Sequence, residues 1–181
     1  EHLENSGSKE EDSLELSQAE QVKLNSILEG DITSFAISLL RKRLGQVKNM
    51  LPGTCALLAE DLWNLFESYA ANQPTYGVKR HLTDARNFAH YLAQKNPNGI
   101  FNVKAHKAVF KYEQTWINSE LSIQFLKIRS FKHDISNYST WLAKRETTPI
   151  YSGKPRVCIW FRISGRHRVL YWELFPRFWP K

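Results

Sequence analysis

The residues of this chain that could carry out chemistry are few, and their spacing matches no catalytic motif. The sequence has no CxxC, HExxH, Walker-type or GxSxG pattern. Metal sites usually need ligands brought together by short helical or loop spacings. The histidines are instead scattered along the chain, at His2, His81, His90, His106, His133 and His167. We therefore expect no catalytic residue, no metal site and no cofactor in this chain.

Glu113 is the most unusual polar residue, because it falls on the apolar side of a helix predicted over about 102–119. That side also carries His106, Trp116 and either Val109 or Phe110. A buried carboxylate is costly unless a partner compensates it. We therefore predict a structural role for Glu113 in an ion pair with a basic residue such as an arginine.

The C-terminal stretch RVCIWFRISGRHRVLYWELF, residues 156–175, mixes arginines with aromatic residues. Two β-rich runs joined at Ser164-Gly165 predict a hairpin. In the first run, one face would carry Val157, Ile159, Phe161 and Ile163. The other face would carry Arg156, Cys158, Trp160 and Arg162.

This hairpin is the candidate binding site. Arginine beside aromatic rings can stack on bases, hold phosphates or bind an acidic peptide. A free edge strand can also accept an extended peptide through main-chain hydrogen bonds. The alternative is that the aromatic residues simply pack the hairpin on the helices, with the arginines solvated. The predicted peptide-binding residues are Arg156, Trp160, Arg162, Arg166, Arg168 and Tyr171.

The charge of the chain is unevenly distributed. Residues 1–31 carry nine acidic and two basic side chains, a net charge of −7, whereas residues 32–181 carry 23 basic and nine acidic ones, a net charge of +14. The basic part would attract a nucleic acid or an acidic peptide. Two widely separated cysteines, Cys55 and Cys158, fit a reducing cytoplasm better than a disulfide framework. No apolar run reaches the roughly 18 residues that a transmembrane helix requires.

The elements that must position these residues are mostly helices, so we predict an α+β fold: an N-terminal helical bundle followed by a small antiparallel β region. The expected parts are an acidic disordered arm over 1–16, a helical domain over 17–119 and a small α+β domain over 120–181. A capping box at Ser17 and Glu20 begins the first helix and Gly30 ends it. Further helices are expected over about 33–50, 54–71 and 83–95. A strand would begin near residue 121, and Asp134 would cap a short helix after it.

Several segments resemble a known family. LPGTCALLAEDLWNLFESYAANQP, LTDARNFAHYLAQK and FKYEQTWINSE are similar to the helical domain of the HvfC/BufC/MbnC-type group, often labelled a DNA-binding domain. FLKIRSFKHDISNYSTWL and PRVCIWFRISGRHRVLYWELFP resemble its C-terminal β region. The resemblance covers about residues 20–175. It matches Glu113 to an acidic position of the group and Arg162 to a basic one.

The size and two-part layout look most like the TglI-like proteins of that group. The resemblance implies a non-catalytic accessory subunit, forming a heterodimer with a TIM-barrel, multinuclear non-heme iron-dependent oxidative enzyme that is TglH-like. The iron would belong to that enzyme. The pair would modify a cysteine of a ribosomally synthesised precursor or carrier peptide (RiPP biosynthesis, of the 3-thiaglutamate type), and this chain would recognise the peptide. The alternative is a nucleic-acid-binding protein that uses the basic, aromatic hairpin.

Overall fold

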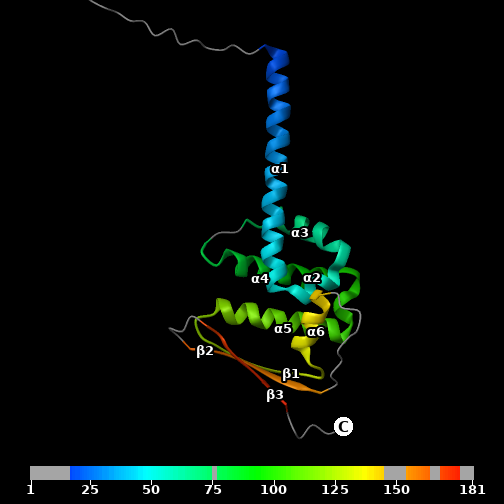
Figure 1. Cartoon of the computed structure of the whole chain (residues 1–181), viewed down its shortest axis with the longest axis vertical. Coiled ribbons are helices and arrows are strands. Elements are labelled where there is room, and N and C mark those ends of the chain that lie inside the picture. The colour runs from blue at the N-terminus through cyan, green and yellow to red at the C-terminus, as the bar shows by residue number, and fades with distance from the viewer. Residues whose placement is uncertain (1–16, 75–76, 145–153, 164–167, 176–181) are drawn as a thin grey trace, which may run out of the picture. The chain divides into compact units, whose positions relative to one another are not determined.

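The computed structural model of the chain describes residues 17–74, 77–144, 154–163 and 168–175. It has the predicted α+β fold, with helices first and a small antiparallel sheet near the C-terminal end (Figure 1). The elements are α1 (Gln18–Met50), α2 (Pro52–Leu58), the 3-10 helix η1 (Ala59–Asp61), α3 (Leu62–Ala70), α4 (Arg80–Lys95), the 3-10 helix η2 (Pro97–Asn102), α5 (Lys104–Leu121), β1 (Phe125–Phe131), α6 (Ile135–Lys144), β2 (Arg156–Arg162) and β3 (Leu170–Leu174).

The chain divides into two compact units, Glu1–Leu39 and Leu40–Lys181. The described part of the first unit is the N-terminal part of α1, which begins with the predicted capping box. The Ser17 backbone N–H donates to Glu20 Oε2 at 2.9 Å, and the Glu20 N–H returns a bond to Ser17 Oγ at 3.4 Å. The predicted break at Gly30 is wrong, because α1 runs through it. A single glycine costs a helix only about 1 kcal/mol and need not end it.

The helical core of the second unit forms around Phe66 and Phe88, whose rings meet edge-on at 5.2 Å. Both side chains are fully buried, as are Leu51 and Leu92. The third predicted helix is interrupted, since Ala59, which follows α2 and begins η1, has a positive φ of 46°. Thr54, at the start of the range predicted for that helix, instead lies inside α2. The helix begins at Pro52, a residue suited to a first helical position because it lacks an N–H.

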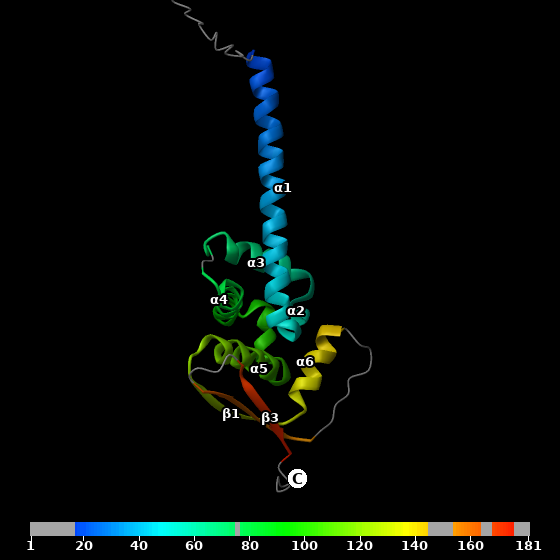
Figure 2. The ribbon, with the colours of Figure 1, turned by 60° about the vertical axis from the view of Figure 1, so that its left-hand side comes forward.

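The sheet has the order β1-β2-β3, with both neighbouring pairs antiparallel. The alternation predicted for β2 is confirmed, and its Arg156, Cys158 and Trp160 side is the buried one. This inner face packs against α5 and α6, which Figure 2 shows on one side of the sheet. The opposite, outer face consists of three residues from each strand: Leu126, Ile128 and Ser130 of β1, Val157, Ile159 and Phe161 of β2, and Leu170, Trp172 and Leu174 of β3.

In the part of the chain that the structure describes, no helix is both long enough and apolar enough to cross a membrane.

Candidate functional site

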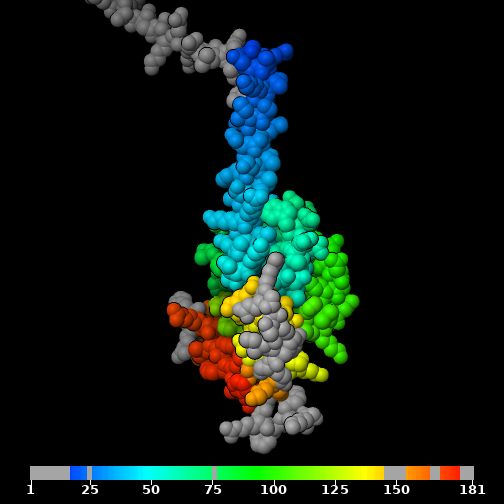
Figure 3. All heavy atoms as spheres, turned by 45° about the vertical axis from the view of Figure 1, so that its right-hand side comes forward, coloured from blue at the N-terminus to red at the C-terminus, as the bar shows by residue number. Residues whose placement is uncertain are grey.

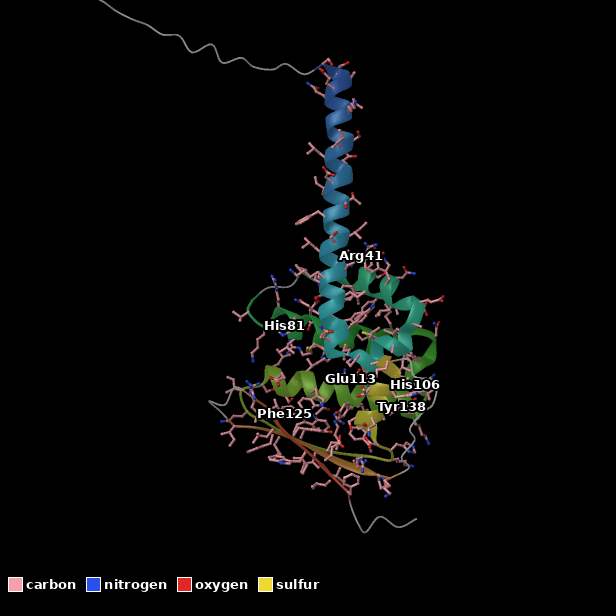
Figure 4. The ribbon with its side chains drawn as sticks, in the orientation of Figure 1. Arg41, His81, His106, Glu113, Phe125 and Tyr138 are labelled. Carbon is pink, nitrogen blue, oxygen red and sulfur yellow. The ribbon has the colours of Figure 1, made fainter. Side chains whose placement is uncertain are left out.

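Glu113 lies in the middle of α5, where α2 and α6 meet it (Figure 4). Its Oε1 accepts hydrogen bonds from the Gly53 N–H at 2.7 Å and from the Ser139 hydroxyl at 2.7 Å. Its Oε2 accepts from the Thr54 N–H at 2.9 Å and from the Thr54 hydroxyl at 2.6 Å. Burial raises the pKa of this carboxyl above its ordinary value, although these four donors favour the ionised form.

The partner of Glu113 therefore differs from the basic residue that the sequence predicted. No arginine pairs with it among the described ion pairs; the N-terminus of α2 takes that place. Leu51 precedes the helix and has no side chain that could accept the first N–H groups. Glu113, about sixty residues later in the sequence, accepts these N–H hydrogen bonds instead. An anion at a helix N-terminus is also favoured by the helix dipole.

Arg156 and Asp134 form a second buried pair beneath the sheet. The Arg156 guanidinium donates to Asp134 Oδ2 and lies 3.6 Å from the centre of the Phe175 ring. Asp134 also accepts from the Asn137 N–H at 3.2 Å, which confirms it as the cap of α6. Burial alone would raise the pKa of Asp134, but the hydrogen bonds from Arg156, Asn137 and Ser136, together with the charge of Arg156, outweigh burial and lower the pKa.

The other hairpin residues predicted to bind peptide also lie mainly on the inner face. Trp160 has no exposed surface and packs against Tyr112, with 5.7 Å between ring centres. Tyr171 is half-buried, 4.8 Å from the Trp116 ring. Arg162 donates to the Glu120 carbonyl at 2.8 Å, near the C-terminal end of α5. These side chains hold the sheet on the helices.

The two remaining predicted binding residues are Arg168 and Arg166. Arg168 is exposed, just before β3. Arg166 lies outside the described residues, as does the predicted Ser164-Gly165 bend. The structure therefore does not bring the six predicted residues together on one open surface.

A different feature is open to a ligand: a groove of about 510 Å³ between the first half of α5, strand β1 and the start of α6. This volume lies within the range of small-ligand pockets. Strand β1 pairs with β2 on one side, and none of the described strands pairs with its other edge. An unpaired strand edge presents backbone N–H and carbonyl groups that can bind another chain.

The groove is strongly basic. Among the described residues that line it, none is acidic. Lys104, Lys107 and Lys111 follow one another at the three- and four-residue spacings of a single helix face, and all three are exposed. Lys127 and Lys132 add two exposed cations from the strand side. These five residues are called the lysine set below.

Arg129 has a different role within the groove. Its Nε donates to the Thr115 hydroxyl on α5 at 2.8 Å, which ties β1 to the helix. The floor between the lysines is apolar and contains the small side chains of Ala105 and Ala108, with Phe131 and Ile135 beside them. The groove thus combines a free strand edge, an apolar floor and a positive rim.

Sequence reasoning missed this groove. The signal was present in the Lys104, Lys107 and Lys111 spacing, but the arginine-rich hairpin was the stronger pattern. That α5 and β1 lie side by side depends on the chain reversal between them, which no local pattern specifies. In Figure 4, Phe125 at the start of β1 and Tyr138 on α6 mark two of the elements beside α5.

Comparison with known proteins adds one finding. A family model described as the SCO6045-like, C-terminal domain matches residues 30–94, from α1 to the end of α4. This is little more than a third of the chain, and it includes neither the groove nor the sheet. No curated protein and no solved structure matches the chain.

Proposed function

We propose that this chain is a non-catalytic subunit that binds an extended acidic peptide in the groove beside β1 and presents it to a partner enzyme. The observation that carries the proposal is the free edge of β1 lying beside the lysine set. The family resemblance described above supplies the partner, a TIM-barrel, multinuclear non-heme iron-dependent oxidative enzyme. The peptide would be the ribosomally made precursor whose cysteine that enzyme modifies, and the iron would be bound by the enzyme.

Strand addition explains how such a peptide would be held. Its backbone would hydrogen-bond to the free edge of β1, which provides affinity without regard to sequence. Every second side chain of the bound peptide would then point toward α5. There Ala105 and Ala108 leave space, and Lys104, Lys107 and Lys111 attract carboxylates. The expected ligand is therefore extended, acidic and free of proline in its central residues.

A fluorescence anisotropy titration with the purified chain tests the groove. The probe is a labelled decapeptide of alternating glutamate and valine, and a lysine–valine decapeptide is the control ligand. Reversing two groove charges, Lys107→Glu with Lys111→Glu, should weaken binding by about 10-fold or more, since charge reversal replaces attraction by repulsion. Lys42→Glu on α1 changes an exposed lysine that does not line the groove, and should leave the affinity unchanged.

Backbone pairing is tested on the ligand. N-methylation at alternate residues of the probe removes the N–H groups on one edge of the peptide. One of the two methylation registers should abolish binding, and the other should be tolerated. Equal binding of both registers would show that main-chain pairing with β1 is not the mode of binding.

Nucleic acid is the competing ligand, because the same lysine set would attract phosphates. A labelled single-stranded oligonucleotide is therefore titrated in parallel from about 50 to 300 mM salt, the range over which phosphate contacts are lost. Tighter binding of the oligonucleotide than of the acidic peptide, with a steep salt dependence, would overturn the peptide proposal and favour a nucleic-acid-binding protein.

The enzyme partner is tested separately by affinity purification of the tagged chain from its native cells. We expect an iron-containing TIM-barrel protein to copurify, with iron present in the complex and absent from the chain purified alone. Stoichiometric iron bound by the isolated chain would contradict the assignment of the metal to the partner.

A further inference from the structure

The outer face of the sheet is apolar, although it is not part of the core. Eight of its nine positions are aliphatic or aromatic, and Ser130 is the exception. None of these nine residues belongs to either apolar cluster of the described chain. Figure 3 shows the red side chains of β3 on the surface of the second unit. Antiparallel sheets that cover one face with helices usually carry polar residues on the other.

The exposed area is comparable to the largest apolar patch on a typical monomer, about 300–600 Å², and patches of this size often mark interaction sites. Leu126 is 64% exposed, Ile128 59%, Trp172 48% and Leu174 51%. With a full surface of about 200 Å² for a side chain of this size, these four residues alone expose about 450 Å². Two such faces packed together would bury about 900 Å² from these residues, and the half-buried neighbours would bring the total above the roughly 1,000 Å² of a specific interface.

We propose that the outer face is a homodimer interface and that a second copy of this chain covers it. No charged residue stands at any of its nine positions, so two copies can meet there without bringing like charges together. That matters because residues 32–181 carry a net charge of +14, which opposes any contact that buries their basic side chains. Twofold homodimers are also the commonest soluble oligomers, and they require a self-complementary patch.

The side-chain sizes specify one orientation of the two copies. Ile159 lies at the centre of the face, between Ile128 on β1 and Trp172 on β3. A twofold axis that runs parallel to β2, between the sheets, places each β1 over the β3 of its partner. The largest side chain, Trp172, then meets Ile128 of the other copy. Aligned packing of this kind, at a sheet separation of about 10 Å, is the usual arrangement in a β-sandwich.

Sedimentation equilibrium of the full chain over a range of concentrations tests this interface, which does not depend on the proposed function. We expect a reversible dimer. Trp172→Lys should raise the dimer dissociation constant by at least about 100-fold, because the twofold symmetry removes two buried aromatic contacts at once. Val103→Lys is the matched control: it adds the same charge at a side chain that is 49% exposed on a different surface, and should leave the dimer intact.

The orientation is tested by mixing two variants, Ile128→Lys and Trp172→Glu. Each alone should be monomeric at concentrations where the wild type is dimeric. The mixture should regain dimers, because the introduced lysine of one chain meets the introduced glutamate of the other, while the second Ile128–Trp172 contact is retained. Circular dichroism of every variant confirms that the fold is intact. A wild-type chain that stays monomeric at about 100 μM, well above a micromolar dissociation constant, or a dimer that Trp172→Lys does not weaken, would overturn the proposal.

Discussion

Removing the Glu113 carboxylate should destabilise the second unit more than any other loss of a single acidic side chain from α5. In Glu113→Ala, the N–H groups of Gly53 and Thr54 lose their acceptor in a buried environment. Each unsatisfied buried donor costs about 1–3 kcal/mol. The hydroxyls of Thr54 and Ser139 can rotate toward other partners, and the loss of a buried charge returns part of the cost. We therefore expect a net loss of about 3 kcal/mol.

The conservative variant separates charge from shape. In Glu113→Gln, the amide oxygen can accept the two bonds of Thr54, but the amide nitrogen then faces the Gly53 N–H, 2.7 Å from the original acceptor. One donor remains unsatisfied, so we expect a loss of about 1–2 kcal/mol. At about 2–4 °C per kcal/mol for a chain of this size, Glu113→Gln should lower Tm by about 2–8 °C and Glu113→Ala by about 6–12 °C.

The assay is urea unfolding followed by circular dichroism, with Glu67→Ala as the control because Glu67 is exposed on α3. A Glu113→Ala variant that loses no more stability than Glu67→Ala would refute the idea that this carboxylate caps α2. The pH dependence gives a second check. Because the pKa of Glu113 is raised on folding, the folded state holds the proton more tightly, and this group's contribution to stability falls as pH rises above about 4.5. The stability difference between wild type and Glu113→Gln should therefore be larger at pH 5 than at pH 8.

Three further predictions concern the buried groups around this centre. Gly53→Ala should cost about 1–3 kcal/mol in urea unfolding, since an added Cβ would lie 2.8 Å from Val109 Cγ1 and 3.0 Å from Glu113 Oε1, and overpacking strains the core. Burial raises the pKa of the Cys55 thiol to about 12 and that of Cys158 to about 11, so neither should react with a thiol reagent at pH 8 until urea unfolds the chain. Arg156→Ala should cost about 3–5 kcal/mol, because it leaves Asp134 buried without its cation; an unchanged urea midpoint would contradict a supporting role for Arg156.

The fold was largely predictable from the sequence because most of its signals are local. The Ser17–Glu20 capping box, the apolar periodicity of α4 and α5, and the Asp134 cap each depend on residues a few positions apart. Gly30 was misread because a glycine permits a helix end without requiring one. The break at Ala59 was missed for the opposite reason, since nothing in an alanine predicts a positive φ.

The site was less predictable, since both faces of the hairpin carry apolar residues and alternation alone cannot tell which one is buried. Arg156 and Arg162 were predicted to bind a ligand, because arginine beside aromatic rings is suited to that role. Their partners are distant in sequence: Asp134 for Arg156, and the carbonyls at the C-terminal end of α5 for Arg162. A helix C-terminus favours a cation, so Arg162 is stabilised where it would otherwise be costly. Only the tertiary structure brings these compensating groups together.

The burial of these arginines links the core to both proposed surfaces. With Arg156 and Arg162 satisfied by α5 and α6, the inner face of the sheet can pack on the helices, and the apolar outer face is left exposed. The same docking sets β1 beside α5, so that the lysine set borders a free strand edge. One arrangement thus produces a basic groove suited to an acidic peptide and an uncharged face suited to a second copy. Because the two surfaces differ in charge, salt should affect their complexes differently. Raising the salt concentration should weaken the peptide complex, whereas the apolar association of two copies should be retained.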